Sequence, residues 1–551
     1  MGYVVLWLEN LAAVLLLTAT VVACASRWKR PIYRIGLPVL ALLLILAAYG
    51  GLTGVVGVLN LHFLAAVWFY PLAVLTFCCI AGACGIVVTG LRREADDSSP
   101  PRAADWPRAK LAMGFALVLA LHLMTFWNLD LAVKQQMSVL RAESGALALS
   151  VAPARVPDRE NAALIYTQAF QVVGDQATWP KAYDDKWCKW LDPGQPGFDA
   201  KDAELRAFLK QQAGALALLR EAGRKPACYF DRDYGRPSID MLLPEMQELR
   251  GGARLLALDA RVKAADHDLH GALDDCRALL SMTDHVASDP LLIAMLVSAA
   301  IQGISAQTLE AVLNSAPATA EDLAPIDVGD TLSYQQAFRR TLRMEEAFGE
   351  ATVYDVATGR FSLGNLEAFD GKAYSWTTPW FPPVYRLFFL GEDLDSFRHI
   401  GATLQRLAMK PYYQAKPDWD GFEAKFVAQP VGLLTKKLAP AVAYCAEAAA
   451  RADAQHDVLR LAVAVCRFQA HHHRFPSDPS ELVPDCIAAV PRDPFDGKPL
   501  RMKETEGKLV VYSIGPDAID NSGAPFDRQK KTGDIPFTVR GWPRDDAHGT
   551  K

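Results

Sequence analysis

Three consecutive histidines, His471 to His473, form the most conspicuous cluster of chemically active side chains in this 551-residue chain. Imidazole nitrogens are common metal ligands, so the run raises the question of a metal site. The preceding stretch HDVLRLAVAVCRFQA predicts a buried helix that ends before Pro476. Chelation on a helix needs side chains three or four residues apart, because successive side chains point about 100° apart. The histidines therefore predict a helix end, where their charge suits the helix dipole, and not a metal site.

The other groupings of acids and histidines predict solvated positions. Glu346 and Glu350 in EEAFGE fall on one face of a helix. Asp266, His267 and His270 in DHDLHG fall in a turn between two helices. The chain has no G-x-S-x-G, no P-loop, no H-E-x-x-H and no paired C-x-x-C pattern. The sequence therefore assigns no catalytic residue and no cofactor-binding residue.

The first 131 residues contain four long apolar runs. They are Tyr3–Ala25, Ile35–Leu59, Leu61–Leu91 and Leu111–Leu131. Each run reaches the ~20 residues that a helix needs to cross a bilayer core. We therefore expect four transmembrane helices.

The arrangement of basic residues predicts the orientation of these runs. Lys and Arg lie between runs one and two and between runs three and four, but not between runs two and three. Positively charged connections stay in the cytoplasm, so both basic loops are predicted inside and the amino terminus outside. Four crossings then place all residues after about 131 outside the cytoplasm. A cleaved signal ending near Cys24 is disfavoured, because the first ten residues lack Lys and Arg and contain Glu9.

Residues 135–450 have a mainly helical pattern. The clearest unit is a pair of helices, about Leu249–Ala265 and Leu269–Val286, joined by a polar turn. This pair resembles a tetratricopeptide-type hairpin over about 40 residues, without a fixed-period copy elsewhere. Stacked hairpins expose concave surfaces that bind partners, although the same helices could pack only to form a core. Both interpretations stay open.

The last part of the chain predicts a short helix and three strands. SDPSEL places Asp478 as the N-cap, Pro479 at the first helical position and Glu481 three residues after the cap. LRMK and KLVVYS, joined through Gly507, predict two strands, and GDIPFTV predicts a third after the loop IGPDAIDNSG. This order resembles the globular part of the major pseudopilin of type II secretion, over about 80 residues from 457 to 537.

The pseudopilin resemblance implies a calcium site in the acidic loop. The family binds Ca²⁺ there, and the matching positions are Asp517, Asp520, Asn521 and, as a fourth candidate, Asp534. Hard oxygen ligands in a loop suit Ca²⁺ better than a transition metal. A structural turn is the alternative, because this loop has fewer acids than the family's. The family's basic leader is not found here, and the module sits at the far end of a polytopic chain, so we expect that it could not enter a pilus fibre in the usual way.

Six cysteines follow the apolar runs: Cys188, Cys228, Cys276, Cys445, Cys466 and Cys486. Outside the cytoplasm they could form disulfides. Cys466 and Cys486 are the leading pair, since their bridge would close a loop of about twenty residues and stabilise the fold by ~3 kcal/mol. Cys188 with Cys228 is a weaker candidate, and free buried thiols are the alternative.

The predicted fold class is mainly α, with four transmembrane helices, an extracytoplasmic helical-hairpin domain and a small C-terminal α+β pseudopilin-like module. The predicted domains are residues 1–131 for the membrane region, 135–450 for the helical domain, 453–540 for the module and 541–551 for a tail. The layout resembles bacterial membrane-anchored envelope proteins without a known activity. It predicts an integral protein of the bacterial inner (cytoplasmic) membrane.

Composition and architecture together favour a binding role. The net charge of −5 gives no nucleic-acid footprint, so we expect no nucleic-acid partner. The lipid bilayer and a protein of the envelope are the expected partners. The leading hypothesis is a non-catalytic binding or scaffolding protein. The alternatives are an accessory component of a type II secretion or pilus-like assembly and an envelope enzyme whose site forms only in the fold.

The predicted orientation can be tested with reporter fusions. Alkaline phosphatase fused after residue 140 is expected to be active, because its disulfides form only outside the cytoplasm. The same reporter fused after residue 100, in the predicted cytoplasmic loop, is expected to be inactive. Activity in the reverse pattern would show that the orientation is wrong.

Overall fold

The computed structural model describes the chain between residues 131 and 542. The described residues are 131, 133–173, 198–238, 241, 243–326, 328, 333–361, 385–386, 389–422, 432, 434–435, 440–527 and 529–542. All four predicted membrane runs except Leu131, and the tail after residue 542, lie outside the described residues.

The described part of the chain is mainly helical with one small sheet, as the sequence predicted. Its α-helices are α5 (Ala162–Val173), α7 (Ala203–Gln211), α8 (Ala213–Gly223), α9 (Glu245–Ala265), α10 (Leu269–Ala287), α11 (Leu292–Leu313), α12 (Ala320–Leu323), α13 (Tyr334–Thr358), α16 (Leu390–Ala408), α17 (Tyr412–Asp420) and α20 (Pro440–His472). Two 3₁₀-helices, η1 (Asp158–Glu160) and η3 (Pro479–Leu482), and three strands, β1 (Arg501–Thr505), β2 (Lys508–Ser513) and β3 (Ile535–Arg540), accompany them.

The described residues divide into two compact units. The larger unit takes those within 144–349, 398–426 and 438–551, and the smaller takes those within 1–143, 350–397 and 427–437. The predicted boundary between helical domain and terminal module, at residues 450–453, falls inside the continuous helix α20. The helical hairpins and the terminal sheet therefore belong to one unit.

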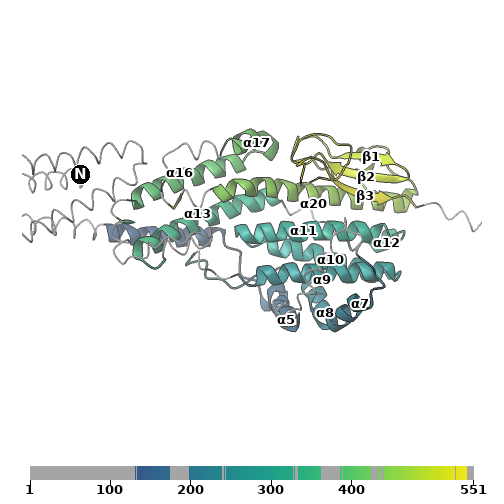
Figure 1. The fold of residues 1–551 in the computed structure, drawn as a ribbon, viewed down its shortest axis with the longest axis horizontal. Helices are drawn as coiled ribbons and strands as arrows, with labels where there is room; N and C mark the ends of the chain where they lie inside the picture. Colours follow the sequence, from purple (N-terminus) through teal and green to yellow (C-terminus); the bar gives the residue numbers. More distant parts are fainter. Residues whose placement is uncertain are drawn as a thin grey trace, which may run out of the picture. The chain divides into compact units, whose positions relative to one another are not determined.

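The larger unit is a stack of helices with the sheet at one side. The hairpin of α9 and α10 is as predicted to within a few residues, and α11 packs against both of its helices (Figure 1). Helices α5, α7 and α8 pack on the α9–α10 hairpin, with α8 mainly against α10. On the other side of α11, α20 packs on α11 and carries the sheet through β2 and β3. The stack therefore runs in the order α5–α8, α9–α10, α11, α20 and sheet.

Helix α11 is the apolar centre of this stack. By length and composition it is the one helix among those described that could span a membrane, and half of its apolar stretch is buried. Ile301 and Leu309 are fully buried, and α9, α10, α20 and β3 all contact this helix. These contacts account for its apolar character, because a helix that is surrounded by protein needs an apolar surface on several sides.

An ion network holds α8, α9 and α10 together. Asp275 on α10 is fully buried and lies 2.5 Å from Arg220 Nε on α8 and 2.7 Å from Lys263 Nζ on α9. Asp259 on α9 pairs with the same two cations. Each charge in the network therefore has an opposite partner, which a buried charge requires.

Half-buried carboxylates from one helix also lie at the start of another. Asp453 on α20 accepts the backbone N–H groups of Tyr334 (2.6 Å) and Gln335 (2.9 Å) at the start of α13. Glu345 on α13 accepts the N–H of Leu292 at the start of α11. Burial of these carboxylates raises the pKa of each to about 7. The free N–H groups of a helix start need acceptors, and tertiary packing provides them here.

The terminal sheet is antiparallel in the order β1–β2–β3. The predicted strands are confirmed, and the turn between β1 and β2 places Glu506 and Gly507 at φ 52° and 70°. A two-residue hairpin loop with positive φ at both positions matches the strand twist, and glycine adopts this conformation without strain. Leu509, Val511 and Phe537 are buried on the face toward α20 and α11.

Each of the five described cysteines is a free thiol. The prediction of a Cys466–Cys486 bridge is therefore wrong in this structure, and Cys188 lies outside the described residues. Cys466 packs in the core of α20, where burial raises the pKa of its thiol to about 12. Cys486 is half-buried against the same core. The alternative of free buried thiols fits these positions.

The smaller unit contains a comparable buried carboxylate. Asp393 is fully buried and accepts the N–H groups of Leu434 (2.9 Å) and Thr435 (3.1 Å) and the hydroxyl of Tyr385 (2.8 Å). Burial raises the pKa of this carboxyl. Its hydrogen bonds join segments more than forty residues apart in sequence, so it has a structural role in this unit.

The raised pKa of Asp453 predicts a loss of stability with rising pH. The folded state holds this proton up to about pH 7 whereas the unfolded state releases it near pH 4, so the contribution is complete below pH 4 and is lost as pH rises through 7. Between pH 5 and pH 8 we therefore expect the free energy of unfolding to fall by about 2 kcal/mol more in the wild type than in Asp453→Asn.

The measurement is the thermal midpoint of the full-length chain, followed by circular dichroism at pH 5 and pH 8. Glu504→Gln, which removes an exposed carboxylate from β1, serves as the matched control and should behave as the wild type. An equal pH dependence in Asp453→Asn and the wild type would contradict the assignment.

Candidate functional site

The histidine run lies where the sequence predicted it, at the end of a helix. His471 and His472 are the last residues of α20, and His473 follows in the left-handed region at φ 55°. All three are exposed, and the ring of His472 packs 4.2 Å from that of Phe468. Among the described residues no three His, Cys, Asp or Glu side chains are placed to hold a metal ion. The run is a helix end.

The other acid and histidine groupings also have structural roles. Asp266 forms an ion pair with Arg206 at 2.6 Å, in the predicted turn between α9 and α10. Glu346 accepts a hydrogen bond from Gln405 (2.6 Å). The expectation of a solvated face is wrong for Glu350, which is only 4% exposed, because the helix that carries it is packed along that side.

Three of the four predicted calcium ligands, Asp517, Asn521 and Asp534, meet, but N–H donors occupy the oxygens of both carboxylates. Asp534 accepts the N–H groups of Asn521 (3.1 Å) and Gly523 (2.6 Å). Asp517 accepts the N–H of Gly533 (2.8 Å) and the amide of Asn521 (3.2 Å). Carboxylate oxygens that already accept backbone N–H groups are not aimed at a common cation.

The fourth predicted ligand, Asp520, contacts residues other than these three. Its carboxylate lies 3.1 Å from Arg501 Nε and accepts the hydroxyl of Tyr512 (3.2 Å) and the N–H of Ser522 (2.9 Å). The loop as it stands does not fit a calcium ion, and the geometry favours a structural turn. Calcium binding at this loop stays a prediction of the resemblance.

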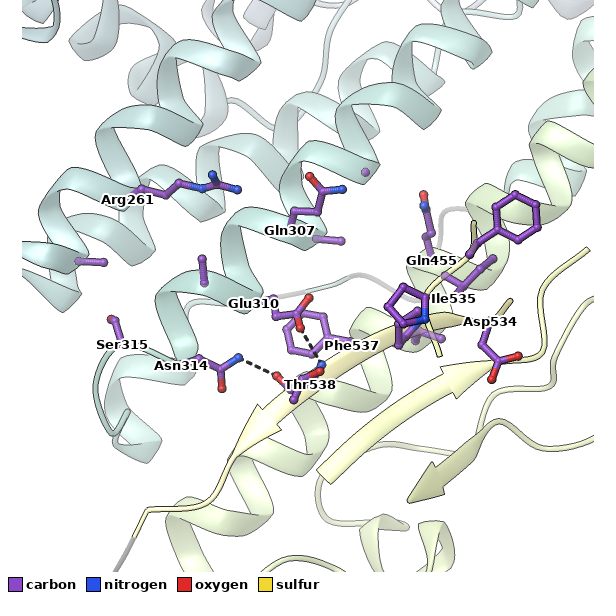
Figure 2. Close-up of a pocket in the computed structure, with 18 of the residues that line it drawn as sticks. Arg261, Gln307, Glu310, Asn314, Ser315, Gln455, Asp534, Ile535, Phe537 and Thr538 are labelled. Atoms are coloured by element: carbon purple, nitrogen blue, oxygen red, sulfur yellow. Dashed lines mark hydrogen bonds between the residues drawn. The ribbon is translucent and has the colours of Figure 1, made fainter. Parts of the chain in front are cut away.

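A cavity of about 950 Å³ lies between α9, α11, α20 and β3. Its polar wall residues include Arg261 on α9, Gln307 and Glu310 on α11, Gln455 on α20 and Asp534 just before β3. Figure 2 shows Arg261 and Gln307 projecting into this space from neighbouring helices. The volume lies in the range of small-molecule and peptide sites.

A second cavity of about 330 Å³ continues the first along α9 and α11. The two share Arg261, Gly303, Gln307 and Gln455. The second adds Arg250 and Arg254 from α9 and a wall of small residues, Ala257, Ala299 and Ala300. We call the two cavities together the arginine groove.

Two arginines of this groove lack a counter-charge among the described residues. Arg261 has no hydrogen bond or ion pair within the described part of the chain, and its Nε atom is buried without a partner. Its guanidinium lies 5.8 Å from the ring centroid of Phe198, and burial lowers its pKa. Arg250 is half-buried and likewise has no ion pair with any described residue. An arginine stays protonated at neutral pH, so both are cations facing a cavity.

The other end of the groove is fixed by the contact of α11 with β3. Glu310 accepts the N–H of Thr538 (3.0 Å), and Asn314 donates to the carbonyl of the same residue (2.7 Å) (Figure 2). Asn314 also accepts the N–H of Arg540 (2.7 Å). Burial raises the pKa of Glu310. These bonds satisfy the edge of β3 and position the strand as a wall of the groove.

The sequence did contain a signal for the arginine groove. Arg250, Arg254 and Arg261 stand at positions i, i+4 and i+11 of ELRGGARLLALDAR, which places them on one face of a helix. The contributions of Gln307, Gln455 and β3 had no such signal, because they come from elements far apart in the chain.

Comparisons with protein-family models, with curated proteins and with solved structures found no match to this chain. The site therefore has to be interpreted from its own chemistry. Its lining residues include no His, Cys, Lys or Tyr among those described, and its two carboxylates, Glu310 and Asp534, accept backbone N–H groups. The arrangement can bind an anion but holds no nucleophile next to a base.

The interpretation of the acidic loop as a structural turn predicts that it is insensitive to calcium. Hydrogen–deuterium exchange of residues 515–535 in the full-length chain should be equal in Ca²⁺ and in EDTA. Asp534→Ala should speed exchange at Asn521 and Gly523 in both conditions, since it removes their acceptor. Slower exchange with Ca²⁺ that Asp517→Asn abolishes would restore the calcium site.

Proposed function

We propose that this protein is a membrane-anchored, non-catalytic binding protein of the bacterial cell envelope that holds its ligand in the arginine groove. The observation that carries the proposal is a groove with two cavities of about 950 and 330 Å³ whose cationic side chains Arg250 and Arg261 lack partners among the described residues. Unpaired, partly buried charges are unfavourable in a folded protein and are usual where a ligand provides the counter-charge.

The part of the proposal that anchors the protein in a membrane is supported by the four apolar runs of the first 131 residues. The distribution of basic residues around them supports an inner-membrane protein whose groove faces the outside of the cytoplasm. A groove on that side would be open to envelope proteins and extracellular ligands.

An accessory role in a type II secretion or pilus-like assembly is the second candidate. It is supported by the order of elements at the end of the chain, where the long helix α20 is followed by η3 and the antiparallel strands β1, β2 and β3. The identity of the partner separates this candidate from a more general binding role.

Filling the groove tests the proposal. A Cβ on Gly303 would meet only Gln455, at 3.8 Å, so Gly303→Trp can place an indole in the groove without a clash at its base. Full-length wild-type protein, extracted from its native membrane in mild detergent, should retain a companion in fixed ratio by mass spectrometry. Gly303→Trp should retain at least about tenfold less, because the indole takes the ligand's volume.

Gly391→Trp is the matched control, because Gly391 is also helical, lies outside the groove and would meet nothing within 4 Å if it carried a Cβ. It should retain the companion. Secretion or pilus components among the companions would favour the second candidate. Equal retention by Gly303→Trp and the wild type, or no companion at all, would overturn the proposal.

A further inference from the structure

Charged residues on the two sides of α9 differ in whether they have partners of opposite charge. On the side toward α8 and α10, Asp259 and Lys263 are both in the ion network with Arg220 and Asp275. On the side toward the groove, Arg250 and Arg261 have no carboxylate partner among the described residues. The charged residues of α9 in the ion network are therefore paired, whereas its two cavity-facing arginines are not. A bound anion would provide the missing counter-charge.

The spacing of the arginines indicates the length of that anion. With a rise of 1.5 Å per residue, Arg250 and Arg254 are ~6 Å apart along α9, and Arg250 and Arg261 are ~16 Å apart. A single carboxylate or phosphate cannot reach all three positions. In an extended peptide the second and fourth residues after a given residue lie ~6.6 and ~13 Å along the chain, with their side chains on the same side. Acidic residues at every second position therefore come within ~3 Å of the arginine spacing, a difference that the long, flexible arginine side chains can cover.

The other groups of the groove fit a peptide main chain. Part of the wall is formed by small residues, so a backbone can approach closely there: Ala257, Ala299, Ala300 and Gly303. Gln307 and Gln455 present amides that can donate to a peptide C=O and accept from a peptide N–H. Peptide recognition commonly combines main-chain hydrogen bonds with a few side-chain contacts.

The end of the groove near β3 disfavours a uniform polyanion, because its one cation, Arg451, is already paired with Glu447 among the described residues. Glu310 and Asp534 line the part of the larger cavity next to β3. A polyphosphate or nucleic-acid chain that filled both cavities would bring its charges against these two carboxylates. A peptide can place its acidic residues at the arginines and neutral residues beyond them.

We infer that the arginine groove binds an extended acidic segment of a partner protein, with Arg250, Arg254 and Arg261 pairing with carboxylates at alternate positions. This inference rests on the proposed binding function and specifies its ligand class. Bidentate guanidinium–carboxylate pairs provide the contacts, and the amides of Gln307 and Gln455 bind the main chain.

The test uses the full-length protein in detergent and a fluorescein-labelled peptide of alternating Glu and Ser, with a Gln–Ser peptide as the neutral control. Fluorescence anisotropy should show binding of the Glu–Ser peptide only, weaker at high salt. Arg250→Gln/Arg261→Gln should weaken binding about tenfold or more, because charge-assisted hydrogen bonds are lost. Neither arginine has an ion pair to lose among the described residues, so the variant should keep the wild-type circular dichroism spectrum.

Two matched variants complete the design. Arg340→Gln/Arg343→Gln removes two exposed cations from α13, outside the groove, and should bind the peptide as the wild type does. Arg261→Lys keeps the charge but not the planar fork, and should bind at an intermediate level.

Equal binding by the groove double variant and the wild type would overturn the inference, as would tighter, arginine-dependent binding of inorganic polyphosphate. A companion that Gly303→Trp releases, together with no binding of the Glu–Ser peptide, would leave the proposed function standing and refute only the acidic ligand. If Gly303→Trp released no companion and the Glu–Ser peptide did not bind, both the proposed function and the acidic ligand would be refuted.

Discussion

The need to bury α11 determines how the larger unit is built. This helix is apolar along most of its length, and α9, α10, α20 and β3 must cover it. Where large side chains such as Leu309 and Val312 meet their neighbours, packing is complete. Where α11 presents Ala299, Ala300 and Gly303 toward α9, the side chains are too small to fill the space between two helices. The arginine groove therefore lies where the side chains of α11 itself change from large to small.

The placement of charge follows from the same packing. The buried and half-buried carboxylates of this unit have partners within the fold: Asp275 pairs with two cations, Asp453 accepts the first N–H groups of α13, and Asp534 accepts N–H groups of the loop before β3. Each bond removes the free-energy cost of a desolvated charge. Against this background Arg261 is an exception, because it has no ion pair among the described residues and its Nε atom is buried without a partner, and the proposed function rests on this exception.

Local signals in the sequence predicted the local structure well. The hairpin of α9 and α10, the end of α20 at the histidines, the η3 turn and the three strands all depend on residues close together in the chain. The groove depends on distant ones: the bonds from Glu310 and Asn314 to Thr538 span more than 220 residues. The pseudopilin resemblance implied calcium at the loop of Asp517, with a structural turn as the alternative, and only the three-dimensional structure shows which donors occupy the oxygens. Composition cannot distinguish a backbone N–H from a cation as the partner of a carboxylate.

These bonds also connect the terminal sheet to the groove in energetic terms. Asp534 holds the loop that leads into β3, and Glu310 and Asn314 hold β3 against α11, so the position of one groove wall depends on the folding of the acidic loop. A ligand that contacts both α9 and this wall binds only when the sheet is docked. It must then stabilise the docked sheet by the same free energy that docking contributes to its affinity. Under the proposed function the sheet serves its own unit as a wall of the groove, so the order of its elements does not require a fibre.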